Sequence, residues 1–132
     1  MRGNGRDARG SDHGAAAVEL ALVLPLLILL VGGIIDFGFA FNSQISLTHA
    51  AREGVRVEAV TGDTDGAEAT AEAAFQAPAA SAPGAQVTQP CSTSDEARMI
   101  VTANTQIFLL QLLPFVDNEI PLEGEAVMRC GG

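Results

Sequence analysis

Residues 15–41 read AAAVELALVLPLLILLVGGIIDFGFAF, which is the most apolar stretch of the chain. Its part from 20 to 35 holds no charge over 16 residues, which span about 24 Å as a helix. The hydrocarbon core of a bilayer is about 30 Å thick, so a helix crosses it only if it starts near Ala15. We therefore predict one membrane-spanning helix, with Glu19 at or just inside one edge and Asp36 at the other.

Two other interpretations of this segment fit less well. A cleaved secretory signal has an apolar run of roughly 7–15 residues followed by a site of small residues. This run is longer and ends in DFGF at residues 36–39. A buried core helix needs a partner large enough to cover it, which a chain of 132 residues does not supply. Three arginines precede the span and the next one is Arg52, so the N-terminus is expected in the cytoplasm.

The composition agrees with an apolar segment joined to an acidic domain. The chain has 16 acidic and 7 basic side chains and a net charge of −9, yet 48% of it is apolar. A nucleic-acid binder is disfavoured, because no basic patch exists to neutralise phosphates. The length excludes a large enzyme with its own cofactor domain. We expect no cofactor, no metal site and no catalytic activity.

The chain divides into three parts by composition. Residues 1–14 are polar and Gly-rich and are expected to be a disordered cytoplasmic leader. Residues 15–60 are expected to form one long helix, whose N-terminal half spans the membrane and whose stop is Gly62. Past the membrane, apolar residues at helical spacing predict one continuous apolar face, comprising Phe37, Phe41, Ile45, Thr48, Ala51, Val55 and Ala59.

Residues 61–132 are predicted to form a small outer domain, which makes the fold α+β. A capping box at Asp65 and Glu68 predicts a short helix over 66–76. Strands are predicted at 86–89, 97–105 and 120–129, giving a small antiparallel sheet. The apolar run at 107–113 is too short to cross a membrane, and it either packs on the long helix as core or offers a patch to a partner subunit.

The two cysteines, Cys91 and Cys130, both lie in the domain expected to face an oxidising compartment. An intramolecular disulfide is expected, and free or intermolecular thiols are the alternative. Bridging the two would close a loop of about 40 residues, worth up to about 4 kcal/mol in the chain-entropy model. His49 and Ser46 lie one turn apart without a third catalytic group, so they are interpreted as a polar helix face.

The junction GAAAVE at residues 14–19 is the sharpest functional feature. Small residues at the cytoplasmic boundary expose the backbone to a membrane protease. A cut after Gly14 would make Ala15 the first residue and Glu19 the fifth. A carboxylate at membrane depth is costly unless it is paired, and an N-terminal ammonium would pair it. Alternatively, Glu19 is a first-turn acid favoured by the helix dipole.

The same residues resemble a known family. Gly followed by an apolar stretch with Glu in fifth place is similar to the class III signal of type IV pilins. The segments GAAAVELALVLPLLILLVGGIIDFGFAF and LTHAAREGVRVEAV resemble the TadE-like family of the tight-adherence (Flp) pilus system. The final EAVMRC resembles that family's last strand more weakly. Many type IV pilins start with Phe where this chain has Ala15, which excludes N-methylation of a Phe.

The resemblance implies a pilin-like fold and a structural function. It implies a minor pseudopilin or assembly component that a prepilin peptidase cleaves after Gly14, leaving Ala15 as the mature start. It also implies that Glu19 pairs subunits. The expected partners are this peptidase, other pilin subunits with their assembly machinery, and membrane lipid. The alternatives are an uncleaved single-span protein with an extracytoplasmic binding domain and an envelope enzyme accessory.

Overall fold

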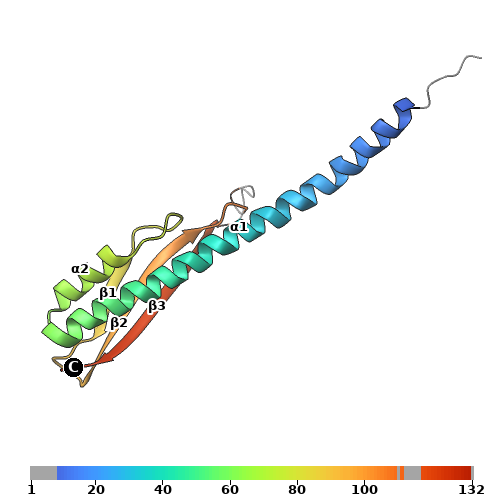
Figure 1. Cartoon of the computed structure of the whole chain (residues 1–132). Coiled ribbons are helices and arrows are strands. Elements are labelled where there is room, and N and C mark those ends of the chain that lie inside the picture. Colours follow the sequence, from blue (N-terminus) through green and yellow to red (C-terminus); the bar gives the residue numbers. More distant parts are fainter. Residues whose placement is uncertain (1–8, 110, 112–116, 132) are drawn as a thin grey trace, which may run out of the picture.

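The computed structural model describes residues 9–109, 111 and 117–131, with side chains from Gly14 onward. Helix α1 (Arg9–Thr61) leads into the short helix α2 (Thr64–Ala74) and then into three strands, β1 (Gly84–Gln89), β2 (Glu96–Gln106) and β3 (Glu119–Arg129). Figure 1 shows α1 as one long rod. The domain packs along its C-terminal half, and the N-terminal half projects beyond it. This confirms the expected α+β fold.

Helix α1 is longer than expected at its start. It begins at Arg9, inside the stretch expected to be a disordered leader, and it continues through Pro25. No proline separates residues 9–14 from the apolar segment, so nothing local ends the helix there. The leader's residues 1–8 lie outside the described part of the chain. At the other end the stop is confirmed, because Gly62 adopts φ +67° and its N–H donates to the Glu58 carbonyl.

Helix α2 has a different cap from the one predicted. Asp63 is the N-cap, and its carboxylate accepts a hydrogen bond from the Gly66 N–H at 3.1 Å. Glu68 and Glu72 contact β1 instead of the helix start. Glu68 Oε1 accepts from the Val87 N–H at 2.9 Å, and Glu72 Oε1 accepts from the Ala85 N–H at 3.4 Å. These two acids therefore accept hydrogen bonds from backbone N–H groups of β1 at the outer edge of the sheet.

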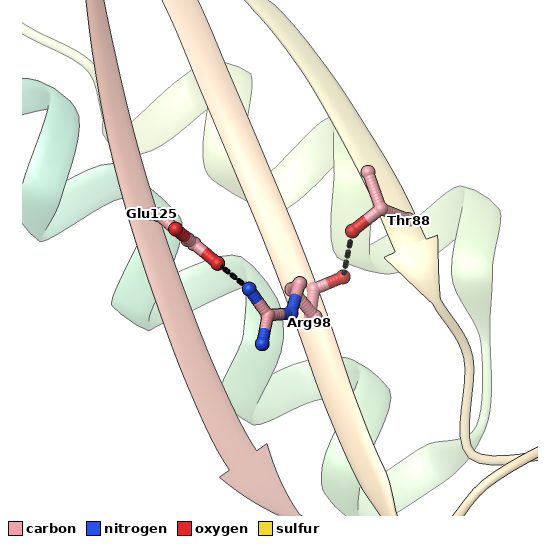
Figure 2. Close-up of polar contacts among 3 residues, drawn as sticks. All are labelled: Thr88, Arg98 and Glu125. Carbon is pink, nitrogen blue, oxygen red and sulfur yellow. Dashed lines mark hydrogen bonds and ion pairs between the residues drawn. The ribbon is translucent and has the colours of Figure 1, made fainter.

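The sheet has the order β1-β2-β3 and is antiparallel throughout. One face of β2 is buried against the helices, and the members of that face are Ala97, Met99, Val101, Ala103 and Thr105. The other face is polar. Figure 2 shows Arg98 on β2 between two neighbours, with its guanidinium paired to Glu125 on β3 and its carbonyl accepting from Thr88 Oγ1 on β1. The pair is exposed and contributes about 0–1 kcal/mol.

The core is built mainly from small residues around α1. Leu47 and Met99 are its largest fully buried side chains. The predicted apolar face of α1 is only half correct. Its later residues, from Ala51 on, are buried, but Phe37, Phe41 and Ile45 are exposed. The domain covers this face only on the C-terminal part of the helix.

Two glycines allow the backbones to approach closely. A Cβ on Gly54 would meet Ala71 Cβ at 2.7 Å and the Ala67 carbonyl at 2.8 Å, and would also collide with the Met99 sulfur. A Cβ on Gly124 would meet the Leu47 carbonyl oxygen at 2.6 Å. Gly54 is therefore the point where α1, α2 and β2 converge, and Gly124 brings β3 directly onto α1.

We predict that Gly54→Ala lowers the free energy of unfolding by about 1–3 kcal/mol, because the added methyl overpacks this contact. Gly38→Ala is the matched control on the same helix, since a Cβ there meets nothing within 4 Å. Denaturant unfolding of the full chain in detergent measures both variants. Equal stability of the two variants would contradict the close-contact interpretation of Gly54.

Candidate functional site

The Gly14–Glu19 junction lies within α1 and is open on all sides. Every residue from 14 to 31 is exposed, and a Cβ on Gly14 would meet nothing within 4 Å. No hydrogen bond or ion pair joins the Glu19 carboxylate to another described residue. The structure thus leaves the Glu19 side chain uncovered, and it places the Gly14–Ala15 bond in exposed helical backbone.

Within the part of the chain that the structure describes, one helical span, Gly14–Thr61, is long enough and apolar enough to cross a membrane. Its most apolar stretch is not buried at all by the rest of the chain. Within this chain, that stretch is therefore not packed as a core helix. A single N-terminal apolar helix of this kind is compatible with a single-pass membrane anchor.

An apolar stripe, formed by Ile34, Phe37, Phe41 and Ile45, continues along α1 beyond the charge-free segment. Each of these side chains is more than half exposed. The rings of Phe37 and Phe41 stack with their centroids 6.1 Å apart. Phe37 follows Glu19 by 18 positions, which is five turns at about 3.6 residues per turn. Glu19 and the stripe therefore lie on the same side of the helix.

Asp36 binds a distant loop and does not simply mark the end of the apolar segment. Only 7% of this residue is exposed. Its Oδ1 accepts from the Phe108 N–H at 2.8 Å, and its Oδ2 accepts from the Leu109 N–H at 2.9 Å. The carboxylate thus satisfies two consecutive donors of the β2–β3 connection and fixes it to α1.

The glycine pair at residues 32 and 33 receives a side chain of the chain's own domain. A Cβ on Gly32 would meet Leu109 Cδ2 at 2.8 Å, and one on Gly33 would meet Leu109 Cδ1 at 3.9 Å. This accounts for the pair without a second helix. In the apolar run at 107–113, expected either as core or as a patch for a partner subunit, Ile107 and Leu109 are partly buried and Phe108 is exposed. The run's Leu110, Leu112 and Leu113 lie outside the described residues.

The structure joins Cys91 to Cys130 in a disulfide whose Cα atoms are 5.7 Å apart. The end of α1 supports this bridge. The Cys91 N–H donates to Glu58 Oε1 at 3.0 Å, and the Gly131 N–H donates to the Ala59 carbonyl at 3.1 Å. Only 1% of Glu58 is exposed. Nothing in the sequence around this acid predicts that it lies in the interior.

The proposed polar pair on α1 is structural. Ser46 Oγ accepts a hydrogen bond from the Gln76 N–H at 2.8 Å, which ties the segment after α2 to α1. His49 is exposed. Among the described residues, no three His, Cys, Asp or Glu side chains gather closely enough to hold a metal ion. The Ser46 contact holds two segments of the domain together.

The family comparison matches the apolar helix. The family model described as TadE-like protein matches residues 14–56, which confirms the resemblance over this part of α1. TadE-like proteins are a structural, pilus-related family, and the similarity to them covers residues 14–56 of this chain, within α1. Searches of curated proteins and of solved structures gave no match to the chain.

We predict that the unreduced protein has no reactive thiol and that reduction lowers its free energy of unfolding by about 2–4 kcal/mol. Denaturant unfolding with and without a reductant measures this loss. The double variant Cys91→Ala, Cys130→Ala serves as the control, because a reductant should leave its stability unchanged. Two thiols that react with a labelling reagent before reduction would refute the bridge.

Proposed function

We propose that this chain is a TadE-like minor pseudopilin or assembly component of a tight-adherence pilus, cleaved by a prepilin peptidase after Gly14. The observation that carries the proposal is the unburied apolar half of α1, which matches the family model and holds Glu19 as its one charge between residues 14 and 35. An uncleaved, single-span anchored protein is the alternative from another class.

The proposed mechanism is lateral association of helices. The apolar half of α1 holds the subunit in the membrane, with its C-terminal domain outside. Cleavage after Gly14 gives Ala15 a free ammonium group. A neighbouring subunit's ammonium pairs with Glu19, because an unpaired carboxylate at membrane depth is costly. This pairing sets the register of one helix against the next.

The side of α1 that meets the neighbour is the one that carries Glu19 and the apolar stripe. Lipid tails cover apolar side chains, but they provide no cation for Glu19. The α1 helix of another subunit provides both an apolar surface and an N-terminal ammonium. We therefore assign this side to helix–helix contact in the assembled state, with the stripe extending the contact outward to Ile45.

Analysis of the membrane-associated protein by N-terminal sequencing or intact mass tests the processing step. The expected mature chain starts at Ala15, because a cut after Gly14 is what frees the pairing ammonium. A peptidase-deficient strain is the control and should retain the leader. A chain that keeps residues 1–14 in the producing strain, or that is cut after Ala40, would contradict the pseudopilin proposal and favour one of the alternatives.

Changes on the assigned side should impair assembly without affecting membrane insertion. We expect Glu19→Ala and Phe41→Ser to reduce pilus yield several-fold while their amounts in the membrane fraction stay unchanged. Phe39→Ser is the matched control, because Phe39 lies two positions from Phe41 and so on a different side of the helix. Normal pilus yield with both test variants, or an equal loss with Phe39→Ser, would show that this side is not the contact.

A further inference from the structure

The contact between Asp36 and the β2–β3 loop places part of the outer domain beside the apolar segment of α1. Asp36 is the residue immediately after the charge-free segment, and the contacts of Leu109 extend back to Gly32. Four residues of helix correspond to about 6 Å along the axis. The loop therefore passes the end of the charge-free segment and lies against residues inside it.

The groove between loop and helix extends further in the same direction. It has a volume of about 350 Å³ and is lined by Leu27, Ile28, Val31, Gly32 and Ile35 of α1 together with Phe108 and Leu109 of the loop. Leu27 precedes Ile35, the last lining residue on α1, by eight residues, or about 12 Å. Half of a bilayer's hydrocarbon core is about 15 Å thick. The groove is thus slightly shorter than one leaflet, and none of its lining residues is charged.

Asp36 also changes the length of apolar surface that α1 offers to a membrane. The charge-free segment alone is about 6 Å shorter than a bilayer core of about 30 Å. Because the Asp36 carboxylate is buried under the loop, apolar surface continues past it through Phe37 and Phe39 to Phe41. The stretch from residue 20 to 41 is 22 residues, or about 33 Å, which is sufficient.

From these observations we infer that the β2–β3 loop at Phe108 and Leu109 is a second membrane contact, inserted into the extracytoplasmic leaflet before assembly, and that a lipid acyl chain fills the groove. This inference rests on the proposed membrane anchoring of α1. Non-helical backbone enters an apolar layer only if its donors are satisfied. The Asp36 carboxylate satisfies the N–H groups of both inserted residues.

The groove belongs to lipid rather than to a neighbouring helix because most of it lies on a different side of α1 from Glu19. Ile28 follows Glu19 by nine positions, or two and a half turns, and so lies on the opposite side of the helix. Only Leu27, at 18 positions before Ile45, lies on the side of the apolar stripe. Its lining contains Gly32 and excludes every residue of the apolar stripe. The loop itself occupies the place at Gly32 where a second helix would approach. A flexible acyl chain fits the remaining space without requiring a cation or a hydrogen bond.

Nitroxide labels on the full chain in phosphatidylcholine–phosphatidylglycerol vesicles test the inference. The labels are placed singly through Phe108→Cys, Leu22→Cys and Thr102→Cys, since the native cysteines are bonded to each other. Leu22 reports on the helix in the bilayer, and Thr102 lies on the polar face of the sheet. We expect the ratio of oxygen to nickel-chelate accessibility at 108 to be several-fold above that at 102 and close to that at 22.

A second pair of measurements tests the role of Asp36. In the protein labelled at 108, Asp36→Ala and Gly32→Leu should each lower the accessibility ratio several-fold, because one removes the acceptor and the other fills the place of Leu109. The label at 102 should be unaffected, which shows that the domain remains folded. An unchanged ratio at 108 in both variants would overturn the assigned contact.

The remaining outcomes separate the two proposals. A label at 22 in lipid with one at 108 in water would overturn the loop insertion and leave the membrane anchor intact. A label at 22 in water would overturn the anchor and the insertion with it. Spectral broadening at 108 that grows with the protein-to-lipid ratio would assign the groove to a second copy and overturn its filling by lipid.

Discussion

Close backbone contact with the C-terminal half of α1 determines how α2, β2 and β3 pack. At Gly54 and Gly124 no side chain fits between the helix and the elements that cross it. Most residues of the surrounding core are alanines, so the core buries little apolar area per residue. Its stability comes from the van der Waals contacts that close packing of the backbones allows. The disulfide and the buried acceptor groups of Glu58 and Asp36 then fix the chain at the two ends of the domain. One continuous helix thus supplies both the projecting apolar segment and part of the core of the domain.

The sequence predicted the elements well because their signals are local. Apolar content and the absence of internal stop signals indicated the long helix, and Gly62 indicated its end. The strands were predicted from β-branched residues and from the alternation of apolar and polar side chains. The disulfide was predicted because both cysteines lie in the domain expected to face an oxidising compartment. The cap of α2 was assigned two residues late, because Asp63 and Asp65 are equally good capping residues and only the backbone distinguishes them.

The missed features are those that depend on tertiary contact. The single apolar face predicted on α1 assumed that periodic apolar residues are buried. The lower part of that face, with Phe37 and Phe41, is instead exposed. Asp36 was expected only at the edge of the membrane span and Glu68 only in a capping box, and no role was predicted for Glu58 or Glu72. Each of these four acids accepts backbone hydrogen bonds from residues far along the chain. No local pattern identifies which acid meets which N–H group 13 to 73 residues later.

Side chains of the helices cover parts of both edges of the sheet. An exposed strand edge is a template for uncontrolled cross-strand aggregation. Here Glu68 and Glu72 bind donors along β1, and Gln44 Nε2 donates to the Glu123 carbonyl of β3 at 2.7 Å. Incoming chains would have to displace these side chains, two of them charged, before they paired with either strand. Crowding therefore favours contacts between helices over the open-ended stacking of sheets.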